Sequence, residues 1–150
     1  MRTKIIIVIL FLLAGVLVFI NYKNTSVKIY TKGHINNQAI SLELAKTPED
    51  QYQGLSDRQS LCPDCGMLFL FNESKSETFV MRKMNFKLDI IWLNNNKIIG
   101  YNENLTPENT EPYTLYKSPS PVNQVLEVNA GYIKNHNLKI NDILTYEESK

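Results

Sequence analysis

The residues with the most distinctive chemistry are the two cysteines of the segment Cys62-Pro63-Asp64-Cys65. Their spacing allows three interpretations. In an exported domain the cysteines form a disulfide across a small loop. As a dithiol they are redox-active, because this spacing lowers the pKa of the first thiol. As two thiolates they supply half of a tetrahedral zinc site. They precede a strand-like apolar run rather than a helix, which is unfavourable for redox chemistry, so a disulfide is favoured.

A metal site would need ligands beyond these cysteines. The two histidines, His34 and His136, lie in polar, turn-like segments and are expected to be exposed rather than to bind metal. The thioethers of Met67, Met81 and Met84, together with cysteine, could select Cu(I). Met67 lies in an apolar run, however, where methionine usually fills the core. No cofactor is therefore predicted, and zinc or copper is kept as an alternative.

Composition and motifs exclude some classes of function. Without Arg2 and Lys4 the chain holds 14 basic and 15 acidic side chains, whereas nucleic-acid-binding domains normally carry a strong basic excess. The sequence contains no Ser-His-Asp order, no phosphate-binding glycine loop and no H-E-x-x-H motif. We therefore expect no nucleic-acid partner, and the sequence favours a protein that is not an enzyme.

Strand-like patterns dominate the chain from residue 27 onward. Some segments alternate between apolar and polar residues, and others are short continuous apolar runs. A hairpin is expected where three asparagines separate two apolar runs, because asparagine tolerates the positive φ angles of tight turns. A turn is expected at 34–38. The expected strands are 27–31, 39–45, 67–71, 78–81, 89–93, 97–101, 125–128 and 143–146.

Two short helices are expected among these strands. Thr47 can cap the first, Pro48 suits its first turn, and Asp50 follows the cap by three residues. Gly54 is a suitable stop. One or two further helical turns are expected at 130–136. The predicted fold is mainly β, a compact antiparallel barrel-like or sandwich-like domain with two short helices and one preceding transmembrane helix, with α+β as the alternative.

An apolar segment precedes the domain. Ile5 to Ile20 contains no charge and follows a basic start. With Asn21 and Tyr22, a helix here approaches the roughly 30 Å thickness of the hydrocarbon core. Because no small-x-small cleavage site follows, an uncleaved anchor is favoured over a signal peptide, whose cleavage would give a secreted protein. The basic start places the N-terminus in the cytoplasm and the domain outside. The expected organisation is an anchor at 1–22, a linker at 23–26 and one globular domain at 27–150.

A series of short motifs runs through residues 42 to 146. They are Glu43-Leu44-Ala45, Thr47-Pro48, Gly54-Leu55, Arg58, Gly66-Met67-Leu68-Phe69, Phe79-x-Met81, Leu88-Asp89-Ile90-Ile91, Val125-Leu126-Glu127-Val128-x-Ala130-Gly131 and Asp142. This order resembles the Domain of Unknown Function 192 family. The resemblance implies a small, mainly β, often exported domain, and it implies no particular chemistry because no activity is firmly assigned to that family. The chain departs from the family pattern around residues 80–87.

Four charged residues coincide with these motifs: Glu43, Arg58, Asp89 and Glu127. One interpretation makes them a polar pocket for a small ligand. The other makes Arg58 the partner of one carboxylate in a structural ion pair that closes a barrel end, and it is favoured because buried charges are usually paired. Glu127 stands between two apolar residues of a strand and therefore faces the opposite side from them.

The segment from Glu103 to Pro121 holds four prolines and no periodicity, and long connections of this kind are often functional. Tyr113 and Tyr116 lie beside these prolines and are candidates for contacting a ligand. The sequence thus predicts a membrane-tethered extracytoplasmic binding or accessory domain for a small ligand, a peptide or an envelope protein. The alternatives are a thiol or metal protein that uses the cysteine pair, and a purely structural envelope domain.

Overall fold

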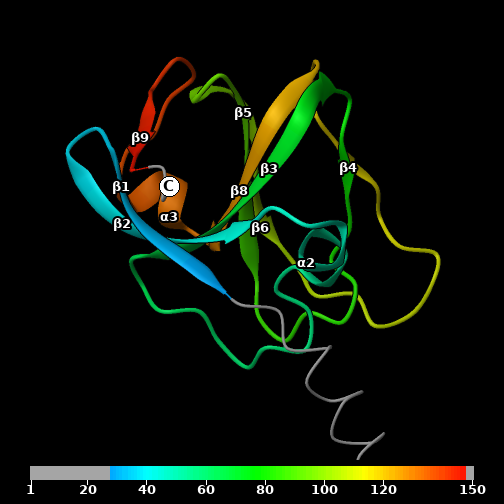
Figure 1. Ribbon diagram of the computed structural model, residues 1–150. Coiled ribbons are helices and arrows are strands. Elements are labelled where there is room, and N and C mark those ends of the chain that lie inside the picture. Colours follow the sequence, from blue (N-terminus) through cyan, green and yellow to red (C-terminus); the bar gives the residue numbers. More distant parts are fainter. Residues whose placement is uncertain (1–27, 148–150) are drawn as a thin grey trace, which may run out of the picture.

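The computed structural model describes residues 28–147, which form nine strands and two short helices (Figure 1). The predicted anchor at 1–22 and linker at 23–26 lie outside the described residues. Within 28–147, no helix is long and apolar enough to cross a membrane. The described chain is mainly β, as the sequence predicts.

Seven strands form one sheet in the order β6-β5-β8-β3-β2-β1-β9. All neighbours in this sheet are antiparallel except β2 and β3. Two further strands, β4 (Thr78–Phe79) and β7 (Tyr116–Lys117), form a separate antiparallel pair. The seven strands of the sheet are β1 (Ile29–Ile35), β2 (Gln38–Ala45), β3 (Cys65–Lys75), β5 (Leu88–Asn94), β6 (Lys97–Leu105), β8 (Val122–Asn129) and β9 (Leu144–Tyr146).

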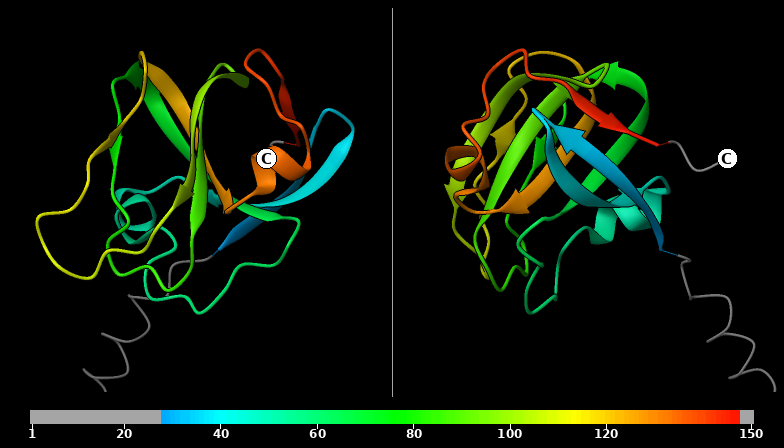
Figure 2. Two further views of the ribbon diagram at one scale, coloured as in Figure 1. Left: turned by 180° about the vertical axis from the view of Figure 1, so that it is seen from behind. Right: turned by 90° about the vertical axis from the view of Figure 1, so that its left-hand side faces the viewer.

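The sheet curls until its two edge strands meet at one end (Figure 2). The backbone N–H of Ile98, in β6, donates to the carbonyl of Asp142 at 2.9 Å, and the N–H of Leu144, in β9, donates to the carbonyl of Asn96 at 2.9 Å. The helix α3 (Tyr132–Asn135) lies inside this curl, between β5 and the pair β1–β2 (Figure 1). The result is a half-barrel.

Each face of the sheet carries its own core. Residues alternate between the two faces along a strand, so Leu68 of β3 packs inside the curl against α3, whereas Met67 and Phe69 pack on the outer face. The outer core is covered by the chain that follows β2 and β3, including α2 (Pro48–Gln53) and β4. The covered outer face is where a cavity lies.

The first helix begins and ends at the predicted residues. The Thr47 hydroxyl caps α2 by accepting a hydrogen bond from the N–H of Asp50 at 3.1 Å, and Pro48 occupies the first helical turn. Gly54 ends the helix with φ 52°, in the left-handed region that favours glycine. The helix prediction is confirmed.

Three sequence-based expectations are wrong in detail. The sheet is not entirely antiparallel, because the crossover through α2 and the following loop returns the chain to the same end and sets β3 parallel to β2. The turn expected at 34–38 narrows to Asn36 and Asn37, both with positive φ, since His34 and Ile35 belong to β1. The loop expected over 103–121 is shorter, because β6 runs to Leu105 and β7 interrupts the remainder.

Candidate functional site

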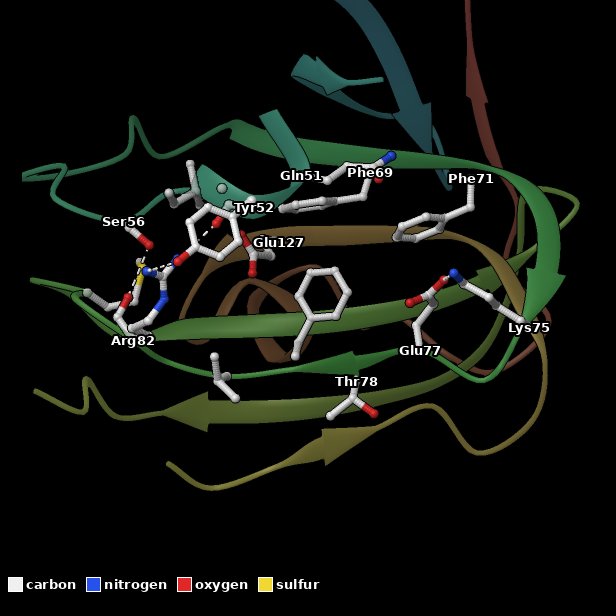
Figure 3. A pocket seen from close by; sticks show the side chains of 15 residues that line it. Gln51, Tyr52, Ser56, Phe69, Phe71, Lys75, Glu77, Thr78, Arg82 and Glu127 are labelled. Carbon is white, nitrogen blue, oxygen red and sulfur yellow. Dashed lines mark hydrogen bonds and ion pairs between the residues drawn. The ribbon is translucent and has the colours of Figure 1, made fainter. Parts of the chain in front are cut away.

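A cavity of about 380 Å³ lies on the outer face of the sheet, beneath α2 and β4 (Figure 3). Its walls come from four parts of the chain: α2 with the loop after it, β3, the segment around β4, and β8. The lining residues are Gln51, Tyr52, Gly54, Leu55, Ser56, Phe69, Phe71, Lys75, Glu77, Thr78, Phe79, Val80, Arg82, Met84 and Glu127.

Glu127 contributes a buried carboxyl group to this cavity. It lies in β8 and faces away from Leu126 and Val128, as the strand alternation predicts. The residue is 5% exposed, and its Oε2 has no hydrogen-bond partner. Burial raises the pKa of this carboxyl from 4.5 to about 8, and the charge of Arg58 offsets only part of that increase. Glu127 is therefore largely protonated at neutral pH.

Gly54 lies close to this carboxyl. A Cβ atom at this position would stand 3.4 Å from Cζ of Phe69 and 3.9 Å from Oε2 of Glu127. The residue that ends α2 therefore also brings the helix terminus close above the cavity.

Aromatic rings form much of the apolar surface. The rings of Phe69 and Phe79 meet edge to face with centroids 4.9 Å apart, and the rings of Phe79 and Trp92 do so at 5.7 Å. Trp92 is buried behind the cavity, and its indole N–H donates to Oδ1 of Asn102 at 2.8 Å. A change in the position of the Phe79 ring would therefore alter the environment of Trp92, the single tryptophan of the chain.

Charged residues stand at the two ends of the cavity, with Glu127 between them (Figure 3). At one end the guanidinium of Arg82 lies 4.4 Å from the ring centroid of Tyr52 and donates to the Tyr52 carbonyl at 2.9 Å. At the other end Nζ of Lys75 lies 3.5 Å from Oε1 of Glu77 in an ion pair. That distance is too long for a hydrogen bond, and Glu77 Oε1 is buried without a hydrogen-bond partner.

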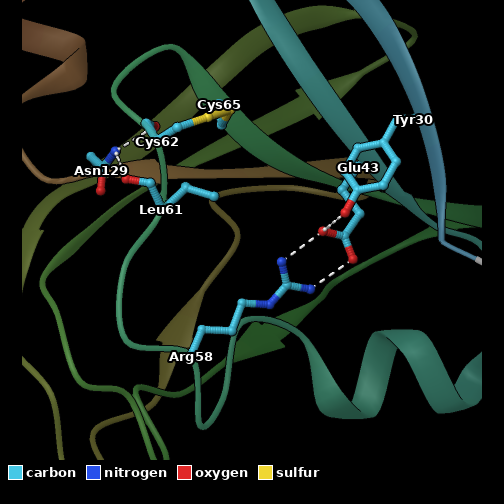
Figure 4. Close-up of a disulfide and its surroundings, with 7 residues drawn as sticks. All are labelled: Tyr30, Glu43, Arg58, Leu61, Cys62, Cys65 and Asn129. Atoms are coloured by element: carbon cyan, nitrogen blue, oxygen red, sulfur yellow. Dashed lines mark hydrogen bonds and ion pairs between the residues drawn. A yellow bond between two sulfur atoms is a disulfide. The ribbon is translucent and has the colours of Figure 1, made fainter.

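Glu43 and Arg58 form a bidentate ion pair outside the cavity (Figure 4). The two terminal nitrogens of Arg58 donate to the two carboxylate oxygens of Glu43 at 2.6 and 2.7 Å. Lys28 lies 3.6 Å from the same carboxylate, and the Tyr30 hydroxyl donates to it at 3.4 Å. Burial alone would raise the pKa of Glu43, but the hydrogen bonds and charge of Arg58 hold it below the ordinary value. The hydrogen bonds to Glu43 raise the pKa of Arg58 in turn.

Asp89 lies on the opposite face of the sheet from Glu127. In the register of β5 and β8, Asp89 is opposite Val128 and therefore shares the inner face. Its buried carboxylate accepts from the N–H of Asn104 at 2.8 Å and from the N–H of Ile133, at the start of α3, at 3.1 Å. The structure thus pairs Glu43 with Arg58 and places Glu127 separately in the cavity. The carboxylate of Asp89 instead binds the backbone N–H groups of Asn104 and Ile133.

Cys62 and Cys65 form a disulfide, as predicted (Figure 4). The amide of Asn129 fixes this loop by donating to the carbonyls of Leu61 at 3.1 Å and Cys62 at 2.9 Å. Within residues 28–147, no group of three or more His, Cys, Asp or Glu side chains is placed to hold a metal ion.

The remaining candidates for metal binding are spread over the fold. His34 is exposed in β1, and His136 ends α3 with its ring 4.1 Å from that of Tyr132. Met67, Met81 and Met84 are all buried within the outer core. Core packing therefore accounts for all three methionines.

Tyr113 and Tyr116 do not line the cavity. Tyr116 lies in β7 opposite Phe79 of β4 and packs against the outer core, and Tyr113 is half-buried. The proline-rich segment therefore supports the strand that forms one wall of the cavity. That these tyrosines contact a partner stays a prediction.

The family model described as "Uncharacterized ACR" and named Domain of Unknown Function 192 (DUF192) matches residues 27–146. The chain belongs to the DUF192 family. The resemblance seen in the short motifs is thus confirmed over nearly the whole domain.

Two crystal structures are similar to this DUF192 domain. One, from Sinorhizobium meliloti, carries a description that suggests a transcription regulator; it is 28% identical, with a TM-score of 0.75 over 82% of this chain and 98% of that chain. The other, a protein of unknown function from Novosphingobium aromaticivorans, is 27% identical, with a TM-score of 0.69 over 79% and 84%. Comparison with curated proteins gives no match.

Most of the residues that line the cavity of this DUF192 domain were not identified from the sequence. The sequence singles out Glu127 as a candidate but not Glu77, Tyr52 or Arg82. The one usable sign was an acidic residue, Glu77, immediately before the apolar run at 78–81. Nothing in the sequence indicated that the chain after β3 folds back over the outer face.

Proposed function

We propose that this DUF192 domain is a membrane-tethered, extracytoplasmic binding domain that holds a small organic ligand in the cavity around Glu127. The observation that carries the proposal is the unpartnered Oε2 of Glu127 in a residue that is 5% exposed. An unsatisfied buried polar group costs about 1–3 kcal/mol. A ligand group in the cavity would supply the missing partner, whereas a purely structural domain has no use for this carboxyl.

The size and lining of the cavity support the same function. Its volume of about 380 Å³ falls within the range of roughly 300–1,000 Å³ that is typical of ligand sites. Such sites combine apolar and aromatic walls with a few polar groups, and here Phe69, Phe71 and Phe79 line the same cavity as Glu127.

The disulfide and the apolar N-terminal segment support the proposed location. A Cys62–Cys65 disulfide suits an oxidising compartment, and Ile5 to Ile20 is apolar enough for an anchor. The description of the Sinorhizobium protein as a regulator of transcription is not extended to this chain. With 16 basic and 15 acidic side chains, it lacks the basic excess of nucleic-acid-binding domains.

Filling the cavity tests the binding function. Val80→Phe enlarges a half-buried lining side chain, and Leu115→Phe is the matched control on the exposed proline-rich segment. Thermal unfolding of the full-length protein is measured against a panel of small organic cations, alcohols and acids. We expect at least one compound to raise the midpoint of wild type and Leu115→Phe but not of Val80→Phe, because only a binder of the native state stabilises it. A panel without any stabilising compound, or equal stabilisation of Val80→Phe, contradicts the proposal.

Thiol labelling tests the compartment. Intact cells are treated with a membrane-impermeant maleimide before and after an impermeant reductant. We expect Cys62 and Cys65 to be labelled only after reduction, since a disulfide outside the cytoplasm is accessible and oxidised. Labelling that requires lysis of the cells would place the domain in the cytoplasm.

A further inference from the structure

We propose that the ligand in this cavity is an organic cation, a primary ammonium group on an apolar body, recognised by the carboxylates of Glu127 and Glu77. This assignment rests on the proposed function, because it names the chemical class of ligand for the same cavity.

The unpartnered polar atoms of the cavity are acceptors. Among the described residues, three buried side-chain atoms lack a hydrogen-bond partner: Oε1 of Glu77, Oε2 of Glu127 and the hydroxyl of Tyr132. The two glutamates line the cavity, and Tyr132 does not. Oε1 of Glu77 only accepts hydrogen bonds, and so does Oε2 of Glu127 once that carboxyl has lost its proton. A ligand that pairs with both oxygens therefore brings donors.

The donors of the lining residues are mostly committed to the protein. The amide of Gln51 donates to the carbonyl of Leu70 at 2.7 Å, and the Ser56 hydroxyl donates to the carbonyl of Arg82 at 3.1 Å. Arg82 itself donates to the carbonyl and hydroxyl of Tyr52 at 2.9 and 3.3 Å. The remaining charged donor of the lining is Lys75, which lies 3.5 Å from Oε1 of Glu77 in their ion pair. An ammonium group brings three further donors for the two carboxylate oxygens that lack a hydrogen bond.

The aromatic walls suit both parts of such a ligand. Phe69, Phe71 and Phe79 line the cavity and offer apolar surface to the body of the ligand. The negative face of an aromatic ring also attracts a cation. The domain already holds a cation in this way, since the guanidinium of Arg82 lies 4.4 Å from the ring centroid of Tyr52.

Binding of an ammonium releases a proton from Glu127. Without ligand, burial raises the pKa of Glu127 to about 8, so the carboxyl is mostly neutral at pH 7. A cation beside it favours the ionised form: the neutral acid and the ammonium combine to give a carboxylate–ammonium pair, and the proton passes to solvent. The other charged groups around Glu127 and its cavity are Glu43, Arg58, Lys75, Glu77 and Arg82.

A matched set of three probes tests the ammonium assignment. Benzylamine, benzyl alcohol and benzoate share one ring and differ in charge. Each is titrated into the full-length protein, and binding is followed by calorimetry and by the fluorescence of Trp92, which contacts the cavity through Phe79. We expect benzylamine at pH 8 to bind at least about ten-fold more tightly than benzyl alcohol, and benzoate not to bind. The affinity for benzylamine is expected to rise at least about ten-fold between pH 6 and pH 8, because less free energy is needed to ionise Glu127 at the higher pH.

Two variants identify the group that is responsible. Glu127→Gln keeps the size of the side chain but cannot ionise, so both the preference for benzylamine and its rise with pH are expected to disappear. Glu73→Gln, an exposed glutamate outside the cavity, is the matched control and is expected to behave as wild type. A preference that survives in Glu127→Gln overturns the assignment to Glu127.

The probes also separate the two proposals. If benzyl alcohol or benzoate binds as tightly as benzylamine, the ammonium assignment is wrong and the cavity is still a binding site. If none of the three binds at up to about 10 mM, a level at which even millimolar affinities are detected, the ammonium assignment is wrong. The proposed function then fails only if the wider panel also gives no stabilising compound.

Discussion

Glu43 and Glu127 occupy one row of the sheet but have opposite environments. Both face outward, and both are opposite Met67 in the register of β3, Glu43 from β2 and Glu127 from β8. They are therefore two strand spacings apart, about 10 Å. Glu43 is held by both terminal nitrogens of Arg58, whereas Oε2 of Glu127 has no partner.

The difference shows that ionic partners offset the effect of burial at Glu43 but not at Glu127. Burial favours the neutral form of both side chains. At Glu43 burial is the largest single influence, but the hydrogen bonds and charges of Arg58 and Lys28 together outweigh it and the pKa falls. At Glu127 burial dominates and the pKa rises to about 8. Because both terminal nitrogens of Arg58 bind Glu43, Glu127 keeps an oxygen that a ligand can contact.

Replacing the unpaired carboxyl should give the largest effect. The pKa of Glu127 is raised on folding from 4.5 to about 8, so the folded state binds the proton more tightly. The contribution of Glu127 to stability is therefore fully present below pH 4.5. It is lost as the pH rises to about 8, at up to about 1.4 kcal/mol per pH unit. We expect Glu127→Gln, which cannot ionise, to raise the free energy of unfolding at pH 8 by about 4 kcal/mol.

Denaturant unfolding followed by Trp92 fluorescence measures this effect, at pH 8 and again at about pH 4. The gain should vanish at the lower pH, because Glu127 is then protonated in both the folded and the unfolded state. An equal effect of Glu127→Gln at both pH values would show that the carboxyl is already ionised in the folded protein, and the contrast with Glu43 would be lost.

Removing the partner of the paired carboxyl should have the opposite sign. Arg58→Ala leaves Glu43 with the longer contact to Lys28, at 3.6 Å, and the hydroxyl of Tyr30. Breaking a buried pair costs about 3–5 kcal/mol, and this pair is partly exposed, so we expect a loss of about 2–3 kcal/mol at pH 7. Because the pKa of Glu43 is lowered on folding, its stabilisation is present above pH 4.5 and is lost in acid.

The same unfolding measurement at neutral and acid pH checks this prediction. Arg58→Lys is the graded control, since lysine keeps the charge but cannot form both hydrogen bonds. A variant Arg58→Ala as stable as wild type would mean that the ion pair contributes nothing to the fold.

Local signals in the sequence were sufficient for most elements. The capping pattern from Thr47 to Gly54 specifies α2 because the cap, the proline and the final glycine each act within one or two turns. The hairpin β5–β6 follows from Asn95 and Asn96, which adopt the positive φ angles that its turn requires. Which segments form strands was therefore predictable from the sequence. The parallel pairing of β2 with β3 was not predictable, because that pairing depends on a long crossover.

The candidate site depended on information that a single sequence does not contain. The outward direction of Glu127 was predictable from its apolar neighbours, but its distance from Arg58 depends on strand order and register. Asp89 looked equivalent to Glu127 in the sequence, yet the pairing of β5 with β8 places it on the opposite face. The site residues around β4 come from a segment whose path is set by packing rather than by a local pattern.

Opening the disulfide should lower stability without changing the contrast between the two carboxyls. The Cys62–Cys65 loop precedes β3 and does not line the cavity. A disulfide stabilises a protein by lowering the entropy of the unfolded chain, and this effect is modest for so small a loop. We therefore expect the double variant Cys62→Ser, Cys65→Ser to lower the free energy of unfolding by about 2 kcal/mol. Urea unfolding should show this loss at every pH, with the pH dependence of wild type retained. A changed pH dependence would mean that the loop also sets the environment of Glu127.

The smallest expected effect comes from a single methyl group above Glu127. Gly54 has φ 52°, and a Cβ there would lie 3.4 Å from the ring of Phe69. We expect Gly54→Ala to cost about 1 kcal/mol of stability through backbone strain and to weaken benzylamine binding several-fold by crowding the free oxygen.

Gly131→Ala separates these two consequences. Gly131 has φ 84°, so alanine there is similarly strained, but its Cβ would meet only Nδ2 of Asn135, at 3.8 Å. This control should lose stability and keep the affinity of wild type for benzylamine in calorimetric titration. Equal weakening by both variants would trace the loss to general destabilisation, and Gly54 would then have no particular role in holding space beside Glu127.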